Sequence, residues 1–430
     1  MKMPAIPAVR LPLGTPPLWA IAMVGAVMIG ACFRLVWVAD MEYKADEAWT
    51  FNRTQNVGST EPFPWLGMGS SVGIRNPGMS IWVFLLLAKL FGARTPTALA
   101  QAVQLLNIAA IALLVLFALI AIPKAEREPW CWAAVLGSVN PLAVLFQRKI
   151  WPQSVLPLFA LVFLAGWWHR HRGWGAFVWG LMGVCLGQIN MSGFFFAAGF
   201  VLWALLFERK AVAWWNWLGG SFLGAMPLIP WLPYLIRDPH LPGELVLRFK
   251  FWGNWVTEPF GLGLKYSLGK QFTDFLRYPL VDGQATYFVL LLHVAVAVIG
   301  AVIIGRGGWR MWQEGRLWGD FVVGRRSSTG FTLSSALWGY GLLFAGSGLP
   351  FHRHYLIVTF PLMFVWVAWL ALLPDREHQG QAAIGRYLLA ALCILESLLT
   401  LNFLYYIHLN HGAILGDYGL AYGALKGSSP

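Results

Sequence analysis

Long apolar runs recur along the whole 430-residue chain. An apolar run of about 18 residues or more can cross the hydrocarbon core of a membrane as a helix. With 58% hydrophobic and only 12% charged residues, the composition is not that of a soluble multidomain protein. The sequence predicts an all-α polytopic membrane protein, a single domain over residues 1–430 with about eleven transmembrane helices. The runs lie at roughly 17–39, 96–121, 130–146, 151–168, 176–190, 192–207, 212–236, 286–304, 331–349, 355–373 and 386–408.

The run 79–91 is too short to count among these spans. At 1.5 Å per residue its helix covers about 20 Å, whereas the hydrocarbon core is about 30 Å thick. We expect a helix that lies in or dips into the membrane face.

Positive charge is distributed unevenly between the two sides of this layout. Thirteen Lys and Arg residues lie in short connections on the N-terminal side, against four in the short segments opposite. An excess of Lys and Arg marks the cytoplasmic side. We therefore expect a cytoplasmic N-terminus, an outer C-terminus and two long outward-facing loops at about 40–95 and 237–285.

The net charge of +12 does not predict binding of nucleic acid. The basic residues are spread over many loops, and no basic stretch is long enough to form a binding arm. Membrane orientation and anionic lipids account for them better. The four cysteines lie inside apolar runs without a CxxC pair, so we interpret them as core residues.

Carboxylates collect in the two long loops, which hold ten of the chain's 19 acids. Asp46 and Glu47 are adjacent, so in a helix or a strand their side chains point in different directions. One could accept a proton while the other positions a substrate or binds a metal. The alternative is a solvated acidic turn at the start of a helix, where acids are favoured. Asp40 and Glu42 are expected to stay at the end of the first span.

Four motifs in order resemble the C-superfamily of membrane glycosyltransferases, which includes protein O-mannosyltransferases and lipid A aminoarabinose transferases. They are "DEAWT" (46–50), "RNPGMSIWVFLLLAKLFG" (75–92), "FQRKIWPQSVLPLFALVFL" (146–164) and "RHYLIVTFPLMF" (353–364). Two positions depart from the family pattern. Asn76-Pro77-Gly78 replaces a Pro-Pro pair, and His354 is inserted between the Arg and the Tyr of the last motif.

The resemblance implies an enzyme of the bacterial inner membrane that uses a sugar on a polyprenyl phosphate. An acceptor hydroxyl on a glycan, lipid or protein would attack the anomeric carbon at the outer face, and the lipid phosphate would leave. Asp46 would be the general base, and Glu47 would orient the acceptor or help to hold a divalent cation. A cofactor is not determined by the sequence.

The phosphate and the sugar require further groups at the same face. Arg suits a phosphate because its planar guanidinium donates two parallel hydrogen bonds. Contact with phospholipid headgroups is the alternative for each basic residue. A metal site would combine His352 and His354 with a carboxylate, although hydrogen-bonded histidines are the simpler interpretation. The substrate-binding candidates are Arg353, Arg148, Lys149, His354, Tyr355, Arg75, Arg248 and Lys250.

A multi-span transporter or a lipid or polysaccharide flippase is the alternative function. It would need ionisable residues near the middle of the membrane, and Glu396 is the one clear example. We find no internal repeat in the sequence, which weakens this alternative.

Overall fold

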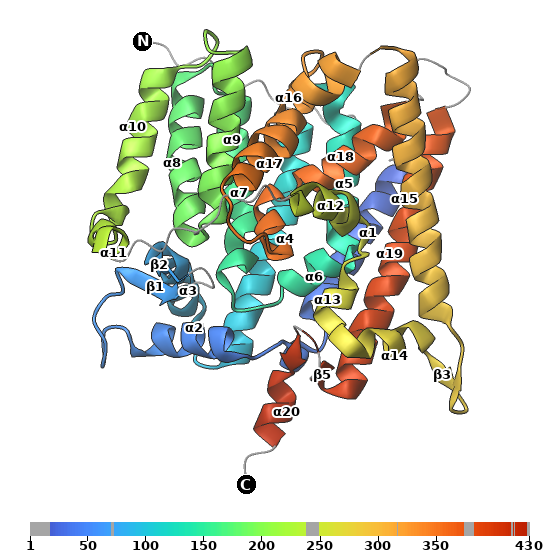
Figure 1. Ribbon diagram of the computed structural model, residues 1–430. Helices are drawn as coiled ribbons and strands as arrows, with labels where there is room; N and C mark the ends of the chain where they lie inside the picture. The colour runs from blue at the N-terminus through green and yellow to red at the C-terminus, as the bar shows by residue number, and fades with distance from the viewer. Residues whose placement is uncertain are drawn as a thin grey trace.

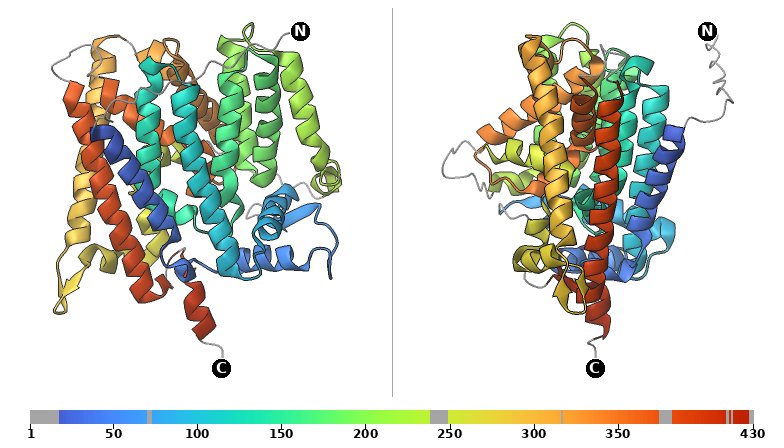
Figure 2. Two further views of the ribbon diagram at one scale, coloured as in Figure 1. Left: turned by 180° about the vertical axis from the view of Figure 1, so that it is seen from behind. Right: turned by 90° about the vertical axis from the view of Figure 1, so that its right-hand side faces the viewer.

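The computed structural model describes residues 18–69, 73–237, 249–315, 317–373, 382–413, 416 and 418–427. The chain forms a bundle of helices that run side by side along one common direction (Figures 1 and 2). By length and composition, α4 (Pro96–Ile120), α15 (Phe288–Gln313) and α19 (Ala382–Asn410) can each cross a membrane. The mostly helical architecture with long apolar helices is confirmed, while the number of spans and their orientation stay predictions.

The remaining predicted spans appear as shorter or broken helices. Most of these breaks coincide with a proline or a capping residue. The elements up to residue 237 are α1 (Leu18–Leu35), α5 (Arg127–Val139), α6 (Pro141–Phe146), η3 (Pro152–Val155), α7 (Leu156–Trp168), α8 (Gly173–Ile189), α9 (Ser192–Phe207), α10 (Trp214–Ala225) and α11 (Leu232–Arg237). Those near the end of the chain are η7 (Leu317–Val323), α16 (Ser328–Ser334), η8 (Ser335–Tyr340), α17 (Gly341–Gly346), η9 (Arg353–Thr359) and α18 (Leu362–Leu372).

The predicted span 130–146 divides at Asn140 into α5 and α6. Asn140 accepts hydrogen bonds from the backbone N–H groups of Leu142 and Ala143, at 3.1 and 3.0 Å, and so caps the new helix. Pro141 follows at the first helical position, where its missing N–H costs nothing. The break directs the turn after α6 toward the end of the bundle that holds the long loops.

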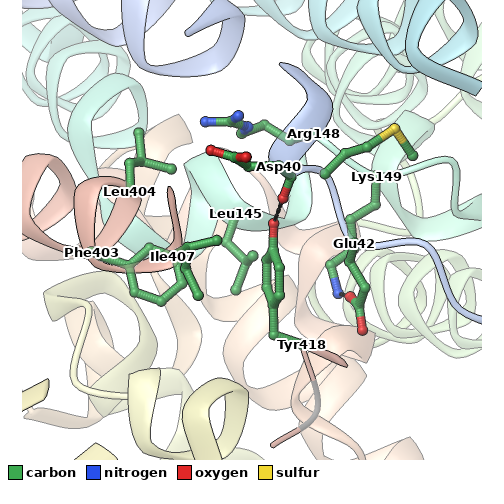
Figure 3. A pocket seen from close by; sticks show the side chains of 10 residues that line it. Asp40, Glu42, Leu145, Arg148, Lys149, Phe403, Leu404, Ile407 and Tyr418 are labelled. Carbon is green, nitrogen blue, oxygen red and sulfur yellow. Dashed lines mark hydrogen bonds and ion pairs between the residues drawn. The ribbon is translucent and has the colours of Figure 1, made fainter. Parts of the chain in front are cut away.

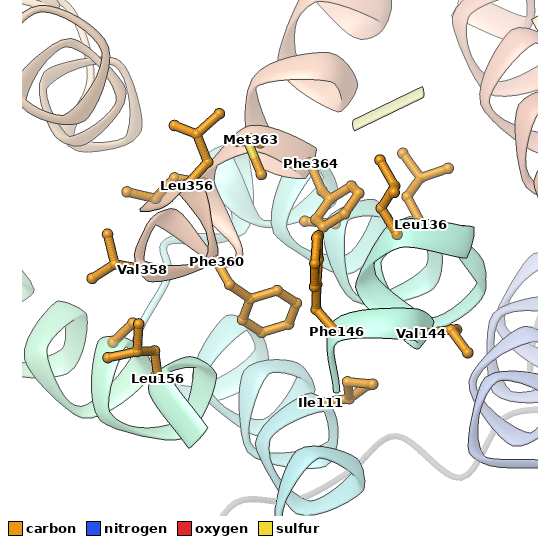
Figure 4. Close-up of a cluster of buried hydrophobic side chains, with 14 of the residues drawn as sticks. Ile111, Leu136, Val144, Phe146, Leu156, Leu356, Val358, Phe360, Met363 and Phe364 are labelled. Carbon is orange, nitrogen blue, oxygen red and sulfur yellow. The ribbon is translucent and has the colours of Figure 1, made fainter. Parts of the chain in front are cut away.

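The predicted span 355–373 bends by 74° between η9 and α18. The bend lies at Pro361, which lacks the N–H that a continuous helix would use. All residues of α18 are buried, and the helix packs against α5 and α15 in the centre of the bundle. Phe360 and Phe364 join Phe146 in the buried apolar cluster of Figure 4.

The first long loop contains α2 (Ala45–Asn56), the antiparallel strands β1 (Leu66–Gly69) and β2 (Arg75–Pro77), and α3 (Met79–Phe91). The helix predicted over 79–91 is confirmed as α3, which packs on α2 and α4. It stays at the loop end of the bundle rather than running its full height (Figure 1).

The second long loop contains α12 (Lys250–Thr257), η5 (Glu258–Phe260), α13 (Leu264–Leu268) and α14 (Phe272–Arg277), then the hairpin β3 (Leu280–Val281) and β4 (Gln284–Ala285). This segment does not simply cover the outside. In α12, Phe251 and Trp255 are fully buried, and the helix packs on α17 and η9. The chain then ends with β5 (Gly412–Ala413), β6 (Gly419–Leu420) and α20 (Tyr422–Gly427).

The connections between α4 and α5, α7 and α8, and α9 and α10 lie at the opposite end from α2, α14 and α20 (Figure 1). The short connections rich in Lys and Arg are therefore far from α2, α14 and α20, whereas α12 of the second long loop lies nearer the middle of the bundle (Figure 1). Which end faces the cytoplasm stays a prediction.

Candidate functional site

Asp46 and Glu47 occupy the first turn of α2 in different environments. Glu47 is 3% exposed and accepts a hydrogen bond of 3.1 Å from the Lys44 N–H, as in a capping box. Burial raises the pKa of Glu47 to about 7. Asp46 is half-buried, and among the described residues its carboxylate makes no hydrogen bond or ion pair. Asp46 is thus the carboxylate available to a substrate, whereas Glu47 holds the helix start.

Lys149 lies in the turn that follows α6 and is buried. Its ammonium forms an ion pair with the carboxylate of Glu42, which itself is 2% exposed. Three aromatic rings surround the same ammonium, with centroids 5.9 Å away for Phe146, 5.4 Å for Trp151 and 5.7 Å for Tyr418. The carboxylate and the negative ring faces offset the loss of water around this buried charge.

Arg353 begins η9 and reaches the second long loop. Its guanidinium donates hydrogen bonds to the Gly263 carbonyl and, at 2.7 Å, to the Ser267 hydroxyl. The same guanidinium lies 5.4 Å from the ring centroid of Phe146 and 5.3 Å from that of Tyr266. Lys149 and Arg353 therefore both contact the ring of Phe146, and the turn after α6 brings two cations to one place.

His354 and Tyr355 belong to the same cluster of rings. The His354 ring lies 4.7 Å from Trp151 and 4.6 Å from Tyr355, and it stacks on His352 at 5.3 Å. The insertion of His354 thus places an imidazole against Trp151, one of the three rings around Lys149.

Arg148 binds backbone carbonyls at and just after the end of α1. Its guanidinium donates to the carbonyls of Phe33, Val36 and Trp37 at 2.9, 2.6 and 2.9 Å. Phe33 lies in the last turn of α1, and Val36 and Trp37 directly follow the helix, where carbonyls have no partner within the helix itself. Three hydrogen bonds of the Arg148 guanidinium hold the backbone at the end of α1, so we favour Lys149 and Arg353 over Arg148 as the phosphate-binding pair.

The other three basic candidates lie apart from Lys149. Lys250 is exposed, and its ammonium lies 5.8 Å from the Tyr266 ring, which Arg353 also contacts. Arg75 has an exposed side chain in β2, and in the described part of the chain no bond or ring contact joins it to Lys149 or Arg353. Arg248 lies outside the described residues.

Two small cavities adjoin these cations. The first, of about 10 Å³, lies between Lys149, Arg148, Glu42, Asp40 and Tyr418 (Figure 3). The second, of about 40 Å³, is lined by Arg353, Glu258, Asn140, Gln147 and apolar side chains that include Phe146 and Phe360. Volumes of this size hold one to a few water molecules rather than a sugar.

A metal site built on His352 and His354 is not assembled. Within the described ranges, no group of three or more His, Cys, Asp and Glu side chains lies close enough to hold a metal ion. The residues present therefore do not fit a bound cation, and we derive no step through one.

Several residues at the site carry no signal in the sequence that would have identified them. Glu42, which we expected only at the end of the first span, forms an ion pair with Lys149. Tyr418 comes from the C-terminal segment, and Arg34 donates from α1 to the Gln147 side chain at 2.8 Å. Their contacts join positions far apart in the chain, which a local pattern does not reveal.

No protein-family model and no curated protein sequence matches the chain. Two solved structures have a backbone that follows a similar course. ArnT from Cupriavidus metallidurans bound to undecaprenyl phosphate is 15% identical, with a TM-score of 0.49 over 96% of this chain and 75% of that one. The Archaeoglobus fulgidus oligosaccharyltransferase in the apo form is 14% identical, with a TM-score of 0.48 over 94% of this chain.

The chain spans 56% of the length of that oligosaccharyltransferase. Both similarities concern the course of the backbone alone. We base the activity on the residues of the site rather than on this likeness.

Proposed function

We propose that the protein is a membrane glycosyltransferase that moves a sugar from a polyprenyl-phosphate donor to an acceptor hydroxyl. The proposal is supported by an available carboxylate, Asp46, in the first long loop and by two cations, the buried Lys149 and the half-buried Arg353, that both contact the ring of Phe146. A base and a phosphate-binding pair are the two elements that such a transfer needs.

In the proposed reaction, the acceptor oxygen attacks the anomeric carbon while Asp46 takes the hydroxyl proton. The bond between that carbon and the phosphate oxygen breaks, and the polyprenyl phosphate leaves with the bonding electrons. Negative charge grows on the phosphate as it departs, so Lys149 and Arg353 would stabilise the transition state more than the bound donor. The aromatic wall of Trp151, His354 and Tyr355 would exclude water from the reacting carbon.

Glu47 would keep Asp46 in place through the start of α2. The donor would enter from the outer leaflet of a bacterial inner membrane, since we assign the loop end of the bundle to the outer face. The acceptor is a hydroxyl of a glycan, a lipid or a protein. The sugar is a hexose or a pentose.

The test is transfer of a radiolabelled sugar in proteoliposomes that contain the purified protein. We expect labelled acceptor and free polyprenyl phosphate in equal amounts with wild type, and neither with Asp46→Asn. Movement of the intact lipid-linked sugar between leaflets, without transfer in either orientation of the protein, would contradict the proposal and favour the flippase.

The flippase alternative gains no support from Glu396. This residue is fully buried in α19, where its carboxylate accepts a hydrogen bond of 2.9 Å from Asn140. Asn140 also donates to the Pro259 carbonyl at 3.2 Å. Glu396 therefore helps to anchor η5 and the turn between α5 and α6, a role that needs no transported ion.

A further inference from the structure

After α19 the chain returns to the start of the first long loop. The Tyr43 N–H donates to the Leu420 carbonyl at 3.2 Å, and the Tyr422 N–H donates to the Met41 carbonyl at 2.9 Å. Ala421 and Glu42 form an isolated antiparallel bridge between these two bonds. We call the described residues of 411–427 the C-terminal strap. It fixes the backbone only a few residues before Asp46.

The C-terminal strap also holds the second long loop. The Tyr418 N–H donates to the Ser267 carbonyl at 3.0 Å. Gly416 lies so close to the backbone of Ser267 that a Cβ atom would not fit there. Because the Ser267 hydroxyl accepts from Arg353, the strap, α13 and Arg353 form one connected group.

Tyr418 is where these contacts meet the cation site. Its side chain is 5% exposed, and its hydroxyl donates to the Asp40 carbonyl (Figure 3). Of the three rings around Lys149, Phe146 and Trp151 lie within a few residues of that lysine in the chain. The third ring, Tyr418, is supplied by the C-terminal strap.

We infer that Tyr418 is a positioning residue for Lys149 and that the C-terminal strap is a working part of the donor-phosphate site. Lys149 has a flexible four-carbon stem, and its ammonium can turn in many directions. The Tyr418 ring blocks one of these directions, and its negative face attracts the ammonium and keeps it among the three rings. A charge that is already in place binds a phosphate with a smaller loss of entropy. This inference rests on the proposed function, because it assigns the phosphate to Lys149.

The first experiment measures binding of a water-soluble short-chain polyprenyl phosphate. Tyr418→Phe keeps the ring and should leave the Kd within about threefold of wild type, whereas Tyr418→Leu should raise it about tenfold, as for a partly desolvated cation–ring contact. Tyr422→Leu is the matched control, because Tyr422 belongs to the same strap. Its ring lies 5.2 Å from that of Tyr43 and is not among the three rings around Lys149. An equal rise with Tyr422→Leu would overturn the inference.

The second experiment separates positioning from a general loss of structure. In a Lys149→Met background, Tyr418→Leu should have no further effect on the Kd, since the charge that it positions is gone. If Tyr418→Leu raises the Kd by the same factor with and without Lys149, the inference is contradicted. If Tyr418→Leu does not fold, 3,4,5-trifluorophenylalanine at position 418 keeps the shape of the ring and weakens its negative face. It should raise the Kd relative to Tyr418→Phe, and an unchanged Kd would overturn the inference.

A third measurement needs no substrate. Acylation of Lys149 by an activated ester, read by mass spectrometry against the exposed Lys270, should become several times faster in Tyr418→Leu and not in Tyr422→Leu. If wild type transfers no sugar but this difference appears, the proposed function fails and the positioning of Lys149 stands. If transfer occurs while the acylation rate and the Kd are unchanged, the inference fails alone.

Discussion

The ammonium of Lys149 pairs with the carboxylate of Glu42 inside the protein, where Glu42 is 2% exposed. Lys44 contacts the other oxygen of Glu42 at 2.7 Å from a more exposed position. Removing one partner of a buried ion pair leaves an uncompensated charge, which costs more than the pair contributes. The first long loop and the turn after α6 are therefore coupled through one carboxylate.

Glu42→Gln should destabilise the protein by about 3 kcal/mol, the low end of the cost of breaking a buried pair. Thermal unfolding in detergent measures this change. Glu42→Gln combined with Lys149→Met should recover part of the loss, because no buried charge is then unpaired. Glu61→Gln, which breaks the more exposed pair with Arg53, is the control and should change stability by less than about 1 kcal/mol. Equal losses in the two single variants would show that burial does not matter here.

Asp46→Asn should lower the rate of transfer by about 100-fold or more, in the range that removal of a general base gives. Asparagine keeps the size of the side chain and loses the ability to take a proton. The initial rate with a radiolabelled donor is the measurement. Asp274→Asn, an exposed acid in α14, should transfer at the wild-type rate. Wild-type turnover by folded Asp46→Asn would remove Asp46 from the mechanism.

Arg353→Lys should retain part of the activity, and Arg353→Ala should lose most of it in turnover as well as in donor binding. Lysine supplies the charge but not the planar pair of donors. Because Arg353 also holds α13 through Ser267, Ser267→Ala is the matched control. It removes that bond and leaves the guanidinium in place. A loss in Ser267→Ala as large as in Arg353→Ala would mean that the arginine acts by holding the loop.

Glu47→Gln should change the pH dependence of stability. Burial raises the pKa of Glu47 to about 7, so between about pH 4.5 and 7 the folded protein binds a proton that the unfolded chain has released. Stability therefore falls as the pH rises through this window, by about 3 kcal/mol for a shift of this size. Glutamine still accepts the Lys44 bond and does not titrate. Thermal unfolding at a series of pH values from 4.5 to 7.5 measures this effect. The melting temperature should depend less on pH in the variant than in wild type, and the same dependence in both proteins would contradict the assignment.

Single cysteines in a chain whose four native cysteines are replaced by alanine test the orientation. Thr60→Cys and Thr273→Cys lie exposed on the two long loops, and Ser328→Cys lies exposed at the opposite end. The first two should react with a membrane-impermeant maleimide in intact cells, and the third only after permeabilisation. Labelling of Ser328→Cys in intact cells would invert the layout and place Asp46 on the cytoplasmic side.

The apolar runs predicted the course of the bundle because length and hydropathy are local properties of the chain. The helix over 79–91 and the long helices α4 and α19 begin and end close to the predicted positions, whereas α15 continues to Gln313, well past the predicted end at 304. The break at Asn140 carries its own local signal, a capping residue followed by proline. Several predicted continuous spans are nevertheless broken, since hydropathy does not distinguish one long helix from two short ones.

The site depended on contacts between distant segments. The motifs indicated Asp46, Lys149, Arg353 and Arg148 as candidates, but they did not reveal that the Arg148 side chain binds the carbonyls at and just after the end of α1. Glu42 and Tyr418 stand in unremarkable stretches of sequence and enter the site only through packing. The sequence by itself determined which segments form apolar helices, since burying apolar side chains is favourable wherever they fall in the chain. Tertiary structure alone decided which charges meet, because an ion pair depends on separation in space and not in sequence.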